Sequence, residues 1–164
     1  MLLKIDYIAA QAQADFERFA ELGADSHKME ITGSLKFNVN IEQEKALSDS
    51  VLVEIKESGR TVIIAASTRD GEESKVLHAF RRVLAYQPHV LLLLVPRHPE
   101  RFDSVANLCT QRGFTLSRRS KHQTVDSSTQ VYLGDSMGEM LSYYRLANIA
   151  FVGGSLVDTG CQNV

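Results

Sequence analysis

The chain has 164 residues, of which 44% are hydrophobic and 23% charged, and its 18 basic and 20 acidic side chains give a formal net charge of −2. This composition is that of a globular chain and excludes disordered, collagen-like and low-complexity proteins. Without an excess of positive charge, binding to nucleic acid is not expected. Two cysteines are too few for a disulfide scaffold, and the longest apolar run, residues 90–95, is far shorter than the roughly 20 residues that span a bilayer. We therefore expect a soluble, cytoplasmic polypeptide.

The first forty residues predict a small βαβ piece. Its expected elements are a strand over residues 5–10, a short helix over 14–22 and a second strand over 29–32. Residues 38–41 and a helical stretch over 42–57 then lead into the rest of the chain. We place a domain boundary near Phe37, between residues 1–37 and residues 38–164.

Five β-rich runs follow or flank amphipathic helices, and this alternation predicts the α/β class, with a parallel sheet covered by helices on both faces. The runs at residues 61–66 and 90–95 are almost continuously apolar, which is typical of central strands buried on both faces. The shorter runs lie at residues 114–116, 130–133 and 149–152. The expected helices span residues 72–86, the stretch between Pro99 and Gly113, and the stretch from near Met137 to Asn148.

Four polar or glycine-rich loops come directly after predicted strands. In an open parallel sheet, ligands bind beyond the carboxyl ends of the strands, so these loops are the candidate site. The four sequences are STRDGEE at 67–73, PRHPER at 96–101, GDSMGE at 134–139 and GGSL at 153–156. Taken alone, the first loop is better explained as a helix cap, and the paired glycines of the fourth are usually a turn. A turn with a cap explains the third loop about as well as ligand binding would.

The second loop favours binding more clearly. Arg97 and His98 lie between Pro96 and Pro99, and the prolines reduce the entropy lost when the two side chains are held in one geometry. Such a loop suits a phosphate or carboxylate bound by charge-assisted hydrogen bonds. Taken together, the four loops predict a site for a nucleotide or another phosphorylated ligand, although neither G-x-x-x-x-G-K-[ST] nor G-x-G-x-x-G occurs.

Other reactive side chains are interpreted structurally. Cys109 lies on the apolar face of a predicted helix and is expected in the core, whereas Cys161 lies in a loop with no nearby histidine to activate it. The basic run at 118–122 is interpreted as a solvated surface loop. The histidines show no metal-ligand spacing on a helix, so no metal site is expected.

In their order along the chain, these loops resemble the Kdo transferases, which add 3-deoxy-D-manno-octulosonic acid (Kdo) to the lipid A precursor. The matching stretches are TGSLKF at 32–37, STRDGEE at 67–73, LLVPRHPERF at 93–102, Arg119-Ser120, GDSMGE at 134–139 and FVGGSL at 151–156. The resemblance implies a glycosyltransferase-B architecture, in which two Rossmann-like domains face a cleft. Residues 1–37 would end the acceptor-side domain, and residues 38–164 would form most of the domain that binds the donor, CMP-Kdo.

The resemblance also implies a donor site. Its expected donor-binding residues are Ser67, Pro96, Arg97, His98, Met137, Gly138, Glu139, Gly154 and Asn163. Pro96 and Arg97 would contact the CMP moiety, and Asn163 would reach the donor phosphate or sugar. The family usually has histidine where this chain has Arg69, and Gly-His-Asn where it has Cys161-Gln162-Asn163, so no role for histidine is carried over to those places.

The family's catalytic base is a glutamate near the start of the acceptor-side domain, upstream of Met1, so no catalytic residue is expected in this chain. Because general-base catalysis needs a carboxylate within hydrogen-bond reach of the acceptor hydroxyl, we expect this polypeptide alone to transfer nothing. The lipid A precursor and the cytoplasmic face of the inner membrane would be met mainly through the upstream part, and no cofactor is expected. The alternative hypothesis is a non-catalytic module that binds a nucleotide sugar or another phosphorylated ligand.

Overall fold

The structure is a computed structural model, and it describes residues 4–34 and 50–158. The chain forms two compact units, residues 1–45 and residues 46–164. The predicted boundary near Phe37 lies outside the described residues and stays a prediction.

The first unit contains the predicted βαβ piece. Strand β1 (Ile8–Ala10) pairs in parallel with β2 (Met29–Ile31), and helix α1 (Gln13–Glu21) connects them with the short 3₁₀ turn η2 (Ser26–Lys28). Of the apolar residues within its described range, 4–34, only Ala10 and Met29 are buried. The element types are confirmed, with the first strand shorter than predicted.

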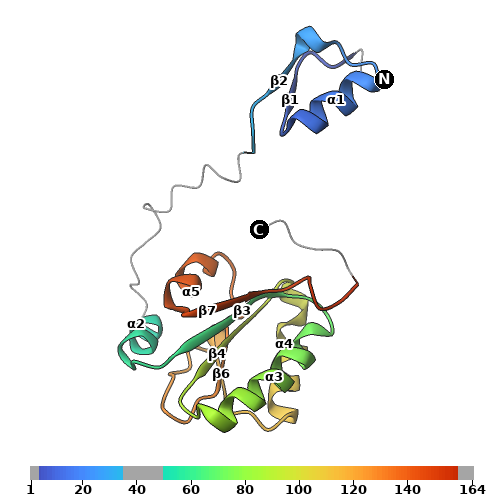
Figure 1. The fold of residues 1–164 in the computed structure, drawn as a ribbon. Coiled ribbons are helices and arrows are strands. Elements are labelled where there is room, and N and C mark those ends of the chain that lie inside the picture. The colour runs from blue at the N-terminus through green and yellow to red at the C-terminus, as the bar shows by residue number, and fades with distance from the viewer. Residues whose placement is uncertain (1–3, 35–49, 159–164) are drawn as a thin grey trace. The chain divides into compact units, whose positions relative to one another are not determined.

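The second unit is built on a five-stranded parallel sheet with the order β5-β6-β4-β3-β7 (Figure 1). The predicted α/β class is therefore confirmed. The strands are β3 (Val62–Thr68), β4 (Leu91–Pro96), β5 (Leu116–Arg118), β6 (Val131–Leu133) and β7 (Ile149–Val152). Every residue of β4 is buried, as expected for a central strand covered on both faces.

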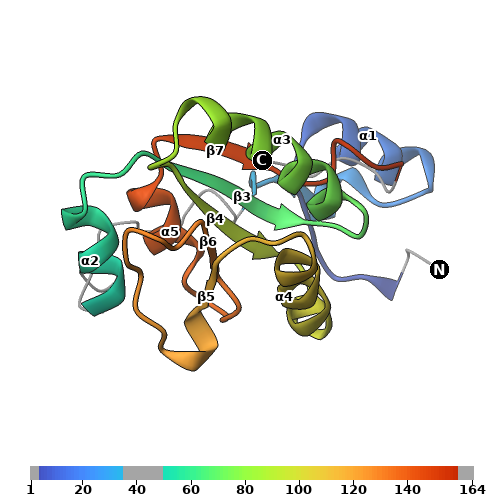
Figure 2. The same ribbon diagram turned by 90° about the horizontal axis from the view of Figure 1, so that it is seen from below.

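Helices cover both faces of this sheet (Figure 2). The helices of the second unit are α2 (Ser50–Glu57), α3 (Glu72–Tyr86), α4 (Phe102–Gln111) and α5 (Met140–Leu146), with 3₁₀ turns η5 (Pro99–Arg101) and η6 (Arg119–Lys121). Helices α2 and α5 pack with Ile64, Leu93 and their same-face neighbours in one core cluster, whereas α3 and α4 pack with the alternating Ala65, Leu92 and Leu94 in the other. Successive strand residues point to opposite faces, so one apolar strand supplies both cores.

Two predicted boundaries are wrong, and both errors are explained by glycine conformations. Gly113 has φ = 74° and ends α4. The chain then needs a short connection, so the strand predicted at 114–116 begins two residues later, as β5 (Leu116–Arg118). Gly138 has φ = 80°, which a helix does not accommodate, so α5 begins at Met140 instead of near Met137. For the stretch predicted as a helix over 42–57, α2 covers residues 50–57, and residues 42–49 lie outside the described part.

Candidate functional site

The sheet order places the site between β4 and β6. These strands are neighbours, yet the chain leaves β4 toward α4 on one face and leaves β6 toward α5 on the opposite face. Neighbouring loops that diverge in this way open a crevice at the carboxyl end of a parallel sheet, where α/β proteins bind their ligands. A pocket of about 450 Å³ lies there. Its lining residues are Ser67, Val95, Pro96, Arg97, His98, Pro99, Ser136, Met137, Gly138, Glu139, Met140 and Tyr143.

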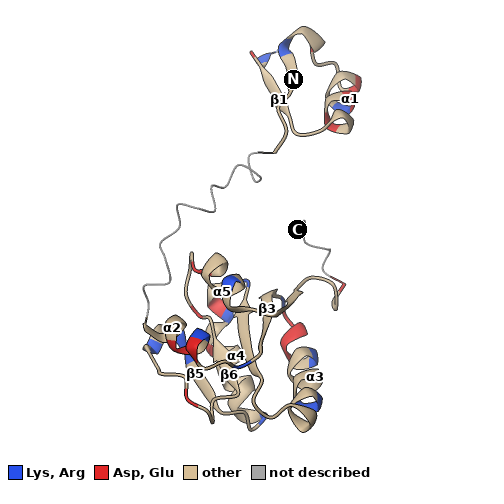
Figure 3. Ribbon diagram, turned by 60° about the vertical axis from the view of Figure 1, so that its left-hand side comes forward, with Lys and Arg blue, Asp and Glu red and all other residues tan. Residues whose placement is uncertain are grey.

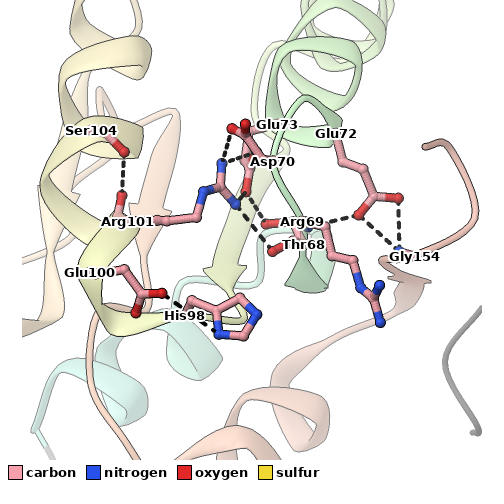
Figure 4. A network of polar contacts seen from close by, with 10 residues as sticks. All are labelled: Thr68, Arg69, Asp70, Glu72, Glu73, His98, Glu100, Arg101, Ser104 and Gly154. Carbon is pink, nitrogen blue, oxygen red and sulfur yellow. Dashed lines mark hydrogen bonds and ion pairs between the residues drawn. The ribbon is translucent and has the colours of Figure 1, made fainter. Parts of the chain in front are cut away.

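The loop after β4 supplies the cationic side of the pocket. The backbone N–H of Arg97 donates to the carbonyl oxygen of Thr68 at 3.0 Å, which ties this loop to the end of β3. His98 lies half-exposed, and its Nδ1 is 3.9 Å from the exposed carboxylate of Glu100 (Figure 4). Because both partners face water, this contact contributes little to stability. The loop thus offers a guanidinium and an imidazole to an anionic ligand.

Ser67 reaches the pocket through an irregularity in β3. The register between β3 and β4 shifts between Ala66 and Thr68, and Ser67 has φ = 52°, a left-handed conformation that is uncommon outside glycine. Such a conformation costs free energy and persists where the surroundings impose it. Ser67, at this bulge, is the residue of β3 that lines the pocket, and the bulge is a feature that the sequence pattern did not show.

The loop after β6 supplies the anionic side. The carboxylate of Glu139 accepts hydrogen bonds from the Arg119 guanidinium at 2.7–3.1 Å, from Tyr143 at 3.1 Å and from Ser136. Burial opposes ionisation of Glu139, but the bonds from Arg119, Ser136 and Tyr143 outweigh it and lower its pKa. Glu139 is therefore an ionised carboxylate held by three side chains, and Gly138 permits close backbone approach beside it.

The basic run at 118–122 is not simply a solvated loop, which corrects the sequence interpretation. The side chains of Arg118 and Arg119 are only 14% and 12% exposed. Arg118 pairs with Asp135 and Asp103 at 2.7 Å, while Arg119 holds Glu139. Both guanidiniums pair with carboxylates of the loop after β6, so these two arginines stabilise that loop.

Asp135 anchors the same loop and gives it a pH-dependent stability. Its carboxylate accepts from the Ser120 N–H, the Ser120 hydroxyl and Arg118 at 2.6–2.7 Å. Burial raises the pKa of Asp135, yet these bonds prevail and bring it below the ordinary value of 3.8. The stabilisation is therefore present above pH 3.8 and is lost as the pH falls through the lower pKa of the folded state.

We accordingly expect Asp135→Asn to lower the free energy of unfolding by about 2 kcal/mol at pH 7. The difference from the wild type should shrink below pH 3.8, and urea unfolding at pH 7 and near pH 3 measures it. Asp70→Asn is the control, because the Asp70 side chain is 95% exposed and its loss should change stability by less than about 0.5 kcal/mol. Equal effects of the two variants would contradict the anchoring role of Asp135.

Gly154 lies apart from the pocket. Its N–H donates to both carboxylate oxygens of Glu72, which also accepts from the N–H of Arg69 (Figure 4). The same carboxylate accepts from the N–H groups of Ser155 and Leu156. A carboxylate of the chain therefore occupies backbone N–H groups of the loop after β7, one of the four loops that the sequence placed in the candidate site. Helix α3 has Gly71 at its N-cap with no side-chain cap hydrogen bond, so STRDGEE does not cap the helix through a side chain, although Glu72 and Glu73 lie in its first turn, where acidic groups complement the helix dipole.

Seven of the nine predicted donor-binding residues line the one pocket: Ser67, Pro96, Arg97, His98, Met137, Gly138 and Glu139. Gly154 does not line it, and Asn163 lies outside the described residues, as does Cys161. Tyr143 was missed, although its ring packs against Gly134 and its hydroxyl meets Ser136 at 2.8 Å. Only the spacing of Glu139 and Tyr143 by one helical turn could have indicated their contact.

Three further expectations concern Cys109, metal ligands and membrane-spanning helices. Cys109 is fully buried on the core face of α4, and burial raises the pKa of its thiol to about 12, so the predicted core role is confirmed. Within residues 4–34 and 50–158 no cluster of three potential metal ligands occurs. The helices of these same ranges include none that is long and apolar enough to cross a membrane.

Comparison with known proteins gives a consistent result. A family model described as 3-deoxy-D-manno-octulosonic-acid transferase matches residues 1–39. The curated 3-deoxy-D-manno-octulosonic acid transferases of Haemophilus influenzae and Bordetella pertussis are 44% and 36% identical to this chain over 99% of its length. The chain spans 38% of the length of each of these two relatives.

A solved structure matches as well. The C-terminal CMP-Kdo binding domain of WaaA from Acinetobacter baumannii is 39% identical, with a TM-score of 0.64, over 69% of this chain and 61% of that domain. Together with the curated relatives, this likeness shows that almost the whole chain is similar to part of the 3-deoxy-D-manno-octulosonic acid transferases.

Proposed function

We propose that the pocket between the loops after β4 and β6 binds CMP-Kdo, and that the whole protein transfers Kdo from it to the lipid A precursor. The observation that carries the proposal is the convergence of Arg97, His98 and Glu139 on one pocket at the divergence of β4 and β6. The related domain from Acinetobacter baumannii, whose title names CMP-Kdo binding, supports the choice of ligand.

The charges of the pocket suit a cytidine nucleotide. The Arg97 guanidinium can form a forked, charge-assisted pair with the phosphate, and the ionised Glu139 can accept hydrogen bonds from hydroxyl or amino groups of the same ligand. During transfer, the phosphate of departing CMP gains negative charge, and a fixed guanidinium stabilises that charge. The residues of this chain thus bind and orient the donor and stabilise the leaving group.

The acceptor side of the reaction belongs to the whole protein. We propose an inverting transfer to the lipid A precursor at the cytoplasmic face of the inner membrane, with the base that deprotonates the acceptor supplied outside this pocket, so that the 164-residue chain binds the donor without turning it over. This division of roles is testable, because binding of CMP requires only the pocket described above.

CMP binding is the first test. In an NMR titration of the 164-residue chain, we expect millimolar CMP to shift the backbone amide signals of Arg97, Met137 and Gly138. Arg97→Ala should weaken CMP binding roughly 10- to 100-fold, since a hydrogen-bonded pair with a charged group contributes about 1.5–3 kcal/mol. Unchanged spectra from a folded sample would rule out the proposed ligand.

The matched control is Arg82→Ala, which removes an exposed arginine from α3 and should leave CMP affinity unchanged. Turnover is tested separately, by measuring CMP release from CMP-Kdo with an acylated glucosamine disaccharide and the full-length protein. Release would support the transferase, whereas tight CMP binding without release would support a non-catalytic nucleotide-sugar module.

A further inference from the structure

A largely buried ion pair joins the loop after β4 to the start of α3. Glu73, on the first turn of α3, receives two parallel hydrogen bonds from Arg101, with Nη1–Oε1 at 2.7 Å and Nη2–Oε2 at 2.8 Å (Figure 4). The side chain of Glu73 is 1% exposed and that of Arg101 is 17% exposed. Figure 3 shows acidic residues at the start of α3 and basic ones further along the helix, so Glu73 belongs to a local acidic end of the helix.

Thr68 connects this pair to Arg97. The Thr68 hydroxyl donates to Glu73 at 2.8 Å, and the Thr68 carbonyl oxygen accepts from the Arg97 N–H at 3.0 Å. Arg101 follows Arg97 by four residues, so the contacts close a ring from Arg97 through Thr68 and Glu73 to Arg101 and back along the chain. Thr68 itself is fully buried.

The ring holds the loop at both ends. Arg97 is fixed at its backbone by Thr68, and the loop is fixed again at Arg101 by the forked pair with Glu73. His98 and Pro99 lie between these anchor points. A side chain whose backbone is held at two nearby points loses less entropy when it binds a ligand.

From this geometry we propose that Glu73 and Arg101 are positioning residues, which hold the loop after β4 so that Arg97 meets the phosphate of the nucleotide. This inference rests on the proposed function of the pocket. Neither Glu73 nor Arg101 lines the pocket, so both act through Arg97. The pair is forked and buried, and removing one partner would leave the other charge in the interior without its counter-charge.

The ratio of the affinities for CMP and cytidine isolates this role. Cytidine lacks the phosphate, so loss of Arg97 positioning should weaken binding of CMP and leave cytidine binding unchanged. We expect Glu73→Gln to lower the CMP-to-cytidine affinity ratio about tenfold, a change typical of residues that act on a site through others. Arg101→Lys, which keeps the charge but loses the fork, should lower the ratio to an intermediate value.

Asp70→Asn is the matched control. Asp70 is the second carboxylate partner of Arg101, at 3.0 Å, but its side chain is 95% exposed, so its loss should leave the ratio unchanged. The wild-type chain is measured first, by NMR titration: a ratio near one would contradict phosphate recognition itself and thus the proposed function. If the wild-type chain prefers CMP to cytidine and folded Arg101→Lys shows the same affinity ratio, the positioning role is overturned. This outcome can be read whether or not Glu73→Gln folds.

Discussion

Replacing Glu72 with glutamine is expected to lower the free energy of unfolding by about 3 kcal/mol, because a buried charged acceptor would be lost. The carboxylate of Glu72 is fully buried. It accepts hydrogen bonds of 2.8–3.2 Å from the backbone N–H groups of Arg69, Gly154, Ser155 and Leu156. A glutamine amide would turn an NH₂ group toward some of these N–H donors. Equilibrium urea unfolding at pH 7 measures the loss.

The pH dependence of the Glu72 effect distinguishes the lost charge from a packing defect. Burial raises the pKa of Glu72, but the four backbone donors outweigh burial and bring the pKa below the ordinary value of 4.5. The contribution of the charge is therefore complete above pH 4.5 and is lost as the pH falls through the lower pKa of the folded state. The difference in the free energy of unfolding between the wild type and Glu72→Gln should therefore shrink as the pH falls below 4.5.

Glu57→Gln serves as the control for the Glu72 variant. Glu57 is exposed at the end of α2, and its replacement should change the free energy of unfolding by less than about 0.5 kcal/mol at any pH. A Glu72→Gln variant as stable as Glu57→Gln, or one whose loss is the same at pH 7 and pH 3, would show that the carboxylate does not hold the loop after β7 as the geometry indicates.

The fold was predictable where hydrophobic pattern alone decides it. The unbroken apolar run at 90–95 is typical of a strand covered on both faces, and β4 is buried throughout. Helix α3 spans the residues that its apolar spacing indicates. The boundaries at Met140 and Leu116 were not predictable, because they depend on left-handed backbone conformations at Gly138 and Gly113 that a glycine permits but does not require.

The site was predictable as a set of loops but not as a set of neighbours. Chain order does not state that β6 lies beside β4, and that pairing decides that the loops at 96–101 and 134–139 share a pocket while Gly154 does not. Long-range charge pairs were equally hidden. Arg119 and Glu139 are 20 residues apart in the sequence, so the pair that orients the pocket carboxylate had no local signal.

Close contacts between distant backbone segments also have no local sequence signal, and Gly153 is the clearest example. Gly153 lies at the end of β7, where its N–H donates to the Ala66 carbonyl oxygen at 2.8 Å. A Cβ atom at this position would lie 2.5 Å from the Ser67 carbonyl oxygen and 2.7 Å from both the Thr68 Cα and Glu72 Oε2. Two of these neighbours are backbone, so no side-chain rotation relieves the clash.

Gly153→Ala is therefore expected to cost about 3 kcal/mol of unfolding free energy, at the upper end of the usual range for an overpacked site. Because the displaced atoms belong to the β3 bulge at Ser67, CMP affinity should fall with stability. Gly59→Ala is the comparison: φ at Gly59 is 65° with nothing within 4 Å of an added Cβ, so only left-handed strain of about 1–2 kcal/mol applies. Urea unfolding of both variants, with a CMP titration of each folded sample, separates the two costs. If Gly153→Ala is instead no less stable than Gly59→Ala and binds CMP with normal affinity, Gly153 does not pack tightly against the bulge. That result would show that only β3 and β4 impose the left-handed conformation of Ser67.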